Sequence, residues 1–171
     1  MRNRLTEYGT ILLRLALGAA FLSAVADRFG LWGAHGEPGV AWGDFEHFTA
    51  YTGTLNWFAP TMLIPALAWA ATVAEVALGL GLILGLHTRT SALLSGLLLM
   101  IFAAAMTSAL GVKAPLNYSV LSAAAGALLL SAQDSFAWSL DSLLGRGRPR
   151  ESRRFSAARR PTDASPAGER A

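Results

Sequence analysis

Three long stretches of the chain are almost free of charged residues, and they limit its fold more than any other feature. Residues 59–86 contain one carboxylate, Glu75, whereas residues 90–112 and 114–133 contain no Asp, Glu, Lys or Arg. At a rise of about 1.5 Å per residue, about 20 helical residues cross a hydrocarbon core of about 30 Å. Because backbone polar groups in lipid must be satisfied within their own segment, such stretches are helices. The sequence therefore predicts an integral membrane protein of the all-α class.

We expect four membrane-spanning helices that form an antiparallel bundle. They lie at about residues 5–29, 60–86, 90–112 and 116–138. Together they would make a membrane domain at residues 1–144. A basic tail at residues 145–171 follows, rich in Arg, Ser, Ala, Pro and Gly and without an apolar period, and we expect it to be disordered.

The first span is open to two interpretations. Its end, Ala24-Val25-Ala26, has the small-residue pattern of a signal-peptidase site. Arg14 within the apolar segment and the polar pair Thr6-Glu7 just before it favour a retained helix instead.

The distribution of basic residues predicts the orientation of the spans. Basic residues occur before the first span, in the turn with His87 and Arg89, and in the tail, whereas residues 30–59 contain Glu37, Asp44 and Glu46 and no Lys or Arg. By the positive-inside rule, both termini are expected to lie in the cytoplasm. The membrane is expected to be the inner membrane of a bacterial cell. The tail is expected to bind the anionic inner leaflet rather than nucleic acid.

The outer loop at residues 30–59 is rich in aromatic residues. One helical stripe within it contains Trp42, Phe45, Phe48, Thr49, Thr52 and Leu55. This pattern predicts a short helix on the outer membrane surface, with its aromatic rings at headgroup depth. A cap packed over the mouth of the bundle is the alternative, and the two are compatible.

Two charged residues, Arg14 and Glu75, lie deep within the spans. Counted from the predicted cytoplasmic ends, Arg14 lies about 13 Å deep and Glu75 about 16 Å deep. We therefore predict a buried Arg14–Glu75 ion pair, with Gly18 and Gly79 allowing the two helices to approach closely. The pair would either fix the helix register or form a proton or quinone-headgroup site. Alternatively, Arg14 snorkels to the cytoplasmic surface and leaves Glu75 protonated.

A second polar group is predicted at the outer mouth of the bundle. Its members are Asp27, Arg28, Lys113, Asn117 and Tyr118. They would either anchor and cap the helices at the interface or bind a ligand at headgroup depth, with Arg28 and Lys113 as donors.

Several classes of site are excluded or disfavoured. The chain has no cysteine, so thiol redox pairs, thiolate metal sites and cysteine nucleophiles are absent. His35 and His47 lack the spacing of a metal site, and no histidine pair within the spans could ligate haem. We therefore predict no metal site and no firmly bound cofactor, and we assign no catalytic residue.

The sequence resembles the DoxX family of small bacterial membrane proteins over about residues 8–141. The matching segments are LRLALGAAFLSAVADRFG (13–30), PALAWAATVAEVALGLGLILGLHTRTSALLSGLLLM (65–100), APLNYSVLSAAAGALLL (114–130) and Ser139-Leu140-Asp141. The family pattern has an Arg and a Gly in the first helix, a Glu before a Gly-rich apolar run, and a Thr-Arg turn. Here these are Arg14, Gly18, Glu75, Gly79 and Thr88-Arg89.

This resemblance implies a four-helix transmembrane bundle with a retained first helix. Named members of the family are associated with quinone-linked oxidoreductases, including thiosulfate:quinone oxidoreductase and a terminal quinol oxidase complex. The function it implies is an accessory or anchor subunit of such a system, with quinone as the cofactor and a redox subunit or a second copy of the chain as the partner. A structural or assembly protein without chemistry is one alternative, and a small oligomeric transporter or channel is another.

Overall fold

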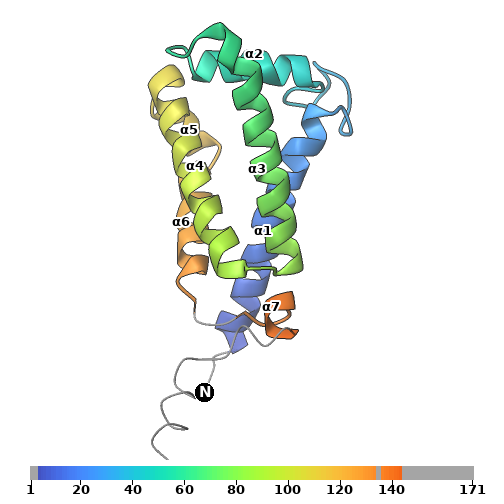
Figure 1. The fold of residues 1–171 in the computed structure, drawn as a ribbon, viewed down its shortest axis with the longest axis vertical. Helices are drawn as coiled ribbons and strands as arrows, with labels where there is room; N and C mark the ends of the chain where they lie inside the picture. The colour runs from blue at the N-terminus through green and yellow to red at the C-terminus, as the bar shows by residue number, and fades with distance from the viewer. Residues whose placement is uncertain (1–3, 134–135, 144–171) are drawn as a thin grey trace, which may run out of the picture.

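The structure, a computed structural model, describes residues 4–133 and 136–143, which form helices and no strand. Three helices in these ranges are long and apolar enough to cross a membrane (Figure 1). They are α1 (Arg4–Arg28), α3 (Ile64–Leu84), which follows the 3-10 turn η1 (Thr61–Leu63), and α4 (Thr88–Leu110). Their lengths and apolar composition bear out the prediction of an all-α membrane protein.

The long helices form the sides of a bundle. α1 packs along α3, and α4 packs along α6 (Val120–Ser131). Helix α2 (Phe45–Leu55) lies across one end of the bundle, whereas the short helix α7 (Leu140–Leu143) lies at the other end, near the start of α1 (Figure 1). We refer to these as the α2 end and the α7 end.

The buried faces of the helices follow a helical period. On α1 the buried residues include Leu17, Gly18, Phe21 and Val25, and Leu17 and Phe21 share a core cluster with Leu82 of α3. Large apolar side chains such as those of Leu12, Leu94 and Ile101 are exposed on the outside of the bundle. An apolar exterior around a helical core is the arrangement expected where lipid is the solvent.

The predicted ends of the first three spans agree with α1, η1–α3 and α4 to within two residues. The prediction of a continuous fourth helix at 116–138 is wrong. That region contains α5 (Lys113–Asn117), a break at Ser119 with a left-handed φ of 56°, and α6, which has 12 residues and ends at Ser131. The hydropathy of the segment gives no sign of the left-handed backbone at Ser119 that breaks the helix. The polar residues after Leu130 favour turns over helix.

The predicted short helix in the outer loop is present as α2. Asp44 caps it by accepting a hydrogen bond from the backbone N–H of His47 at 2.8 Å. Phe48 and Thr52 on its predicted stripe are buried against the bundle. The predicted basic tail at 145–171 and its boundary with the membrane domain lie outside the described residues.

Candidate functional site

The contact between α1 and α3 sets the levels of the charged residues on these two helices relative to one another. The two helices run in opposite directions (Figure 1). Gly18 and Gly79 face each other: a Cβ placed on Gly18 would lie 2.8 Å from the carbonyl oxygen of Gly79, and one on Gly79 would lie 3.2 Å from the carbonyl oxygen of Gly18. The backbones therefore touch at this point, which only residues without a side chain permit.

Glu75 of α3 is buried and forms an ion pair with Arg28 of α1. The Nη2 group of Arg28 lies 2.8 Å from Oε1 and 2.6 Å from Oε2 of Glu75, and both side chains are 3% exposed. The Nη1 group of Arg28 donates to the hydroxyl of Thr72 at 2.9 Å. That hydroxyl in turn donates to the backbone carbonyl of Ala68 at 2.8 Å. A charged pair can be stable in lipid when it is bonded in this way.

Helix geometry explains why Arg28 reaches Glu75 from the end of α1. Side chains on an α-helix lean toward the N-terminus of their own helix. Arg28 therefore leans toward the middle of the bundle, whereas Glu75, on an antiparallel helix, leans toward the α2 end. The two side chains converge between α1 and α3.

Helix α2 and the loop before it cover this pair. The ring of Phe48 lies 3.7 Å from the guanidinium carbon of Arg28, and the ring of Trp42 lies 5.4 Å from it. Both are cation–π contacts, which are strongest where water is excluded. We call Arg28, Glu75, Thr72 and Phe48 the buried charge network.

The predicted Arg14–Glu75 ion pair is wrong. Arg14 lies four residues before Gly18, toward the α7 end, whereas Glu75 lies four residues before Gly79, toward the α2 end. Their levels in the bundle therefore differ by about eight residues, or about 12 Å. Arg14 instead donates from Nη2 to the carbonyl of Trp138 at 2.6 Å and from Nη1 to that of Ala137 at 3.4 Å.

The structure divides the predicted outer-mouth cluster into two parts. Asp27 and Arg28 are buried, and Asp27 accepts hydrogen bonds from three consecutive backbone N–H groups. These donors are Ala41, Trp42 and Gly43, at 2.9 to 3.0 Å. Asp27 thus fixes the loop that leads into α2.

The other three members of that cluster lie apart from the first two. Lys113, Asn117 and Tyr118 are exposed, and within the described residues no hydrogen bond or ion pair joins them to Asp27 or Arg28. Tyr118 instead lies near Tyr51 of α2, whose pKa is raised by burial and by the neighbouring Tyr118 phenol.

The predicted cytoplasmic turn is held by Asp141, a residue close to the described end of the chain. The carboxylate of Asp141 accepts hydrogen bonds from the backbone N–H groups of His87 at 2.9 Å and Thr88 at 2.6 Å, where α4 begins. Burial opposes ionisation of Asp141, but these hydrogen bonds outweigh it and hold its pKa below the usual range. Arg89 is exposed in the same turn. Asp141 therefore caps α4 across a large sequence separation.

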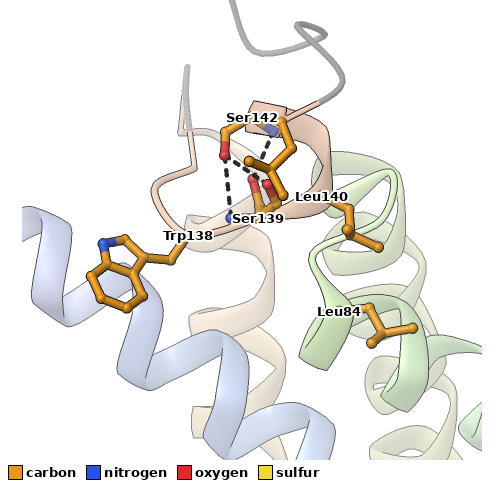
Figure 2. Close-up of a pocket in the computed structure, with 6 residues that line it drawn as sticks. Leu84, Trp138, Ser139, Leu140 and Ser142 are labelled. Carbon is orange, nitrogen blue, oxygen red and sulfur yellow. Dashed lines mark hydrogen bonds between the residues drawn. The ribbon is translucent and has the colours of Figure 1, made fainter.

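A hollow at the α7 end is lined by apolar side chains and two serines (Figure 2). Its lining residues are Leu84, Trp138, Ser139, Leu140, Ser142 and Leu143. The serines bond to each other's backbone: Ser142 Oγ donates to the Ser139 carbonyl at 2.6 Å, and Ser139 Oγ accepts from the Ser142 N–H at 3.1 Å. Among these lining residues, no histidine or carboxylate orients either hydroxyl as a general base would.

The two histidines of the outer loop stack on each other. The rings of His35 and His47 are 3.6 Å apart and nearly parallel, and Nδ1 of His47 lies 2.7 Å from Asp44. The hydrogen bond from the His47 backbone N–H is the main reason that the pKa of Asp44 is lowered. In the part of the chain that the structure describes, no three His, Asp or Glu side chains are placed to hold a metal ion.

Sequence reasoning did not identify the partners in this site. The sequence places Arg28 at the mouth of the bundle, Phe48 on the aromatic stripe of the outer loop, and Asp141 only within a segment that matches the family. The predicted Gly18–Gly79 contact could have shown that Arg14 and Glu75 do not pair. When the two antiparallel helices are aligned on this contact, Arg14 lies on its α7 side and Glu75 on its α2 side.

Comparison with known families agrees with this architecture. A family model described as DoxX matches residues 9–109, which is more than half of the 171-residue chain. The chain belongs to the DoxX family. The DoxX match runs from α1 into α4 and includes Arg14, Arg28 and Glu75. No curated protein and no solved structure matches the chain significantly.

Proposed function

We propose that this DoxX protein is a non-catalytic membrane subunit that anchors a partner of a quinone-linked oxidoreductase system. Family membership and the apolar helices make the chain a multi-pass membrane protein. The link to quinone chemistry comes from the family resemblance, which is an argument by analogy. The observation that supports an anchoring role is the bonding of its buried charges.

Each buried charged side chain in the described bundle is bonded to another part of the fold. Arg28 and Glu75 bind each other, Asp27 binds the loop before α2, Arg14 binds backbone carbonyls at the α7 end, and Asp141 caps α4. A catalytic acid or base needs a partner in the substrate and a pKa matched to the reaction. These side chains are already bonded within the protein, so we assign the oxidoreductase reaction to a partner subunit.

We expect the interior of the described bundle to be a poor site for a quinone headgroup. A quinone carbonyl needs a hydrogen-bond donor, and the Nη groups of Arg14 and Arg28 already donate to protein oxygens. Their Nε groups and the hydroxyl of Thr88 are buried without a hydrogen-bond partner in the described part of the chain. Because these atoms are buried, we expect that a quinone would have to displace protein side chains to reach them. We therefore expect a quinone to meet the exposed surface of the chain or its partner.

Purification from native membranes in mild detergent tests this proposal. A tagged chain should carry a redox subunit with it, and membranes lacking the chain should lose quinone-dependent oxidoreductase activity. If the chain purifies alone and its removal leaves that activity unchanged, the redox assignment is wrong. Co-purification of a partner without redox activity would favour the alternative, a structural or assembly protein, which the closed charge network also supports.

We also propose that both termini face the cytoplasm in a bacterial inner membrane. The exposed residues Arg4 and Arg89 lie at the α7 end, whereas Glu37 and Glu46 are exposed in the region of the α2 end. This asymmetry follows the positive-inside rule. A fluorescent-protein fusion at the C-terminus should then fluoresce and an alkaline phosphatase fusion should be inactive. The reverse pattern would overturn this orientation.

A further inference from the structure

The aromatic residues at the α2 end divide into two groups. Trp42, Phe45 and Phe48, which belong to the predicted surface stripe, pack inward. Trp42 contacts Phe48 at 5.1 Å, and Phe45 contacts Trp69 of α3 at 4.4 Å. Trp42 and Phe48 cover the guanidinium of Arg28, and Phe45 contacts α3, so these three rings pack against the bundle.

A second group of aromatic residues remains uncovered. Trp57 is 69% exposed and Phe58 is 68% exposed in the segment that leads into η1 and α3. Trp32 is also exposed, and its indole N–H donates to the carbonyl of Ser23 on α1 at 3.1 Å. Because Ser23 lies within α1, this bond turns Trp32 back along the spanning helix.

At the α7 end, Trp138 is 86% exposed and its position is fixed by its neighbours. Its φ of 53° is left-handed, which is uncommon for a bulky residue. Arg14 holds the Trp138 carbonyl at 2.6 Å, and the next residue, Ser139, is buried. Figure 2 shows the indole extending toward α1, away from the two serines. A strained backbone retained by a buried arginine indicates that the position of this side chain is specified.

The distance between the two groups corresponds to the thickness of a bilayer. Trp57 and Phe58 precede Thr61, whereas Trp138 lines the same hollow as Leu84 at the opposite end of α3. The segment from Thr61 to Leu84 has 24 residues, which correspond to about 35 Å at about 1.5 Å each. This length exceeds the hydrocarbon core of about 30 Å by a few ångströms at each side.

We propose that Trp57 and Phe58, with Trp32, lie among the phospholipid headgroups of one leaflet and that Trp138 lies among those of the other. Tryptophan prefers this depth, where its ring meets apolar surroundings and its N–H group can reach a polar partner, which for Trp32 is the Ser23 carbonyl. The apolar ring of Phe58 contacts the Trp57 ring and shares its depth. The occupant of this exposed aromatic surface is phospholipid, because the surface continues the apolar exterior of the spanning helices. Arg14 is a positioning residue that holds Trp138 at its depth. The loop region around α2 thus rests on the membrane.

Depth-dependent fluorescence quenching tests this placement. The chain has five tryptophans, so five single-tryptophan variants can be made by changing the other four to Phe. In vesicles of phosphatidylcholine and phosphatidylglycerol, Trp57 and Trp138 should lose more intensity to nitroxides near the headgroup than to nitroxides near the chain end. Trp69, within α3, should show the opposite preference, and Trp42, packed on Phe48, should respond weakly to both.

Strong quenching of Trp57 or Trp138 by aqueous iodide, without quenching by lipid nitroxides, would overturn the proposal. Weak quenching by both would also overturn it and would indicate a protein partner over these rings. In the Trp138 variant, Arg14→Gln should move the indole away from the headgroup depth. The same change in the Trp57 variant should leave its quenching unaltered.

A second measurement retains all five tryptophans. Since the chain has no cysteine, Phe58→Cys and Glu37→Cys can each carry a single spin label. The label at residue 58 should collide with oxygen dissolved in lipid, whereas the label at residue 37 should collide with a water-soluble nickel complex. Equal accessibility of both labels to the nickel complex would contradict a membrane-resting loop. Neither result depends on the proposed redox role.

Discussion

Arg28 connects three helices: α1 carries it, Glu75 and Thr72 of α3 accept its hydrogen bonds, and Phe48 of α2 covers its guanidinium. Removing one member of a buried ion pair leaves the other charge without compensation in a medium of low dielectric constant. Replacing both members with apolar side chains avoids that penalty. The pair is therefore expected to behave as one unit when it is mutated.

A double-mutant cycle measures this coupling. Arg28→Met and Glu75→Leu should each lower the free energy of unfolding by about 3–5 kcal/mol, and the double variant should lose much less than the sum. Unfolding in mixed micelles, followed by circular dichroism, gives the four free energies. The matched control is Arg14→Met with Glu75→Leu, which should be additive within about 0.5 kcal/mol because the two side chains do not meet. Coupling of Glu75 to Arg14 and not to Arg28 would contradict the observed pairing.

The sequence led to the wrong arginine for a definable reason. Depths counted from the predicted helix ends, Leu5 and Leu86, place Arg14 and Glu75 at one level only if the two ends themselves lie at the same level. The Gly18–Gly79 contact instead places Leu84, the last residue of α3, level with about residue 13 of α1, so α1 extends beyond α3 at the α7 end. The Gly18–Gly79 contact, itself part of the same prediction, gives a local register that separates Arg14 from Glu75. Arg28 reaches Glu75 because helical side chains lean toward the N-terminus of their own helix, and counting residues along the helices does not include this lean.

At the scale of elements, the α1–α3 contact depends on the absence of a side chain at Gly18. A Cβ there would lie 2.7 Å from Cγ1 of Ile83 and 2.8 Å from the carbonyl oxygen of Gly79, and the latter, being backbone, cannot move away cheaply. Gly18→Ala should therefore lower the free energy of unfolding by about 1–3 kcal/mol.

Gly9 provides the matched control in the same helix, because a Cβ there would meet nothing within 4 Å. Gly9→Ala should raise the stability by about 0.5–1 kcal/mol through helix propensity alone. Thermal unfolding in detergent compares the two variants. Equal effects of the two substitutions would show that the close approach of α1 and α3 does not restrict residue 18.

The cap that Asp141 provides to α4 should make stability depend on pH. A carboxyl whose pKa is lower in the folded state stabilises the fold above its unfolded pKa of about 3.9, and this contribution is lost as the pH falls through the folded value. Asp141→Asn should cost about 0.5–2 kcal/mol at neutral pH. The difference between the variant and the wild type should shrink below about pH 4. Melting temperatures measured from neutral to acidic pH check this, and a constant difference at all pH values would exclude the ionised cap.

The elements themselves could be predicted to very different degrees. Helices α1, α3 and α4 could be predicted from long stretches with few charged residues, because an apolar segment in lipid has few alternatives to a helix. The α5–α6 break depends on the backbone of Ser119, and the cap on α4 depends on a residue more than fifty positions away. Neither is encoded in a local pattern.

Across the whole molecule, two sets of polar contacts hold the helix bundle together, one toward each end. The buried charge network joins α1, α2 and α3 toward the α2 end, and Arg14 and Asp141 bind the chain around Trp138 to α1 and α4 at the α7 end. The apolar exterior between them is available to lipid and, under the proposed function, to a partner subunit. This arrangement accounts for charged residues inside a membrane domain without assigning them a reaction.

We propose that Glu75 supports the fold and takes no part in proton or electron transfer. Glu75→Gln tests it most directly, because Gln retains an oxygen that can accept from Arg28 but cannot exchange a proton. Quinone-dependent activity should be compared between membranes that contain equal amounts of the folded variant and wild-type chain, with membranes lacking the chain as the baseline. We predict the same activity per folded molecule for both, with a lower melting temperature for the variant. Loss of activity at an unchanged amount of folded protein would contradict this account.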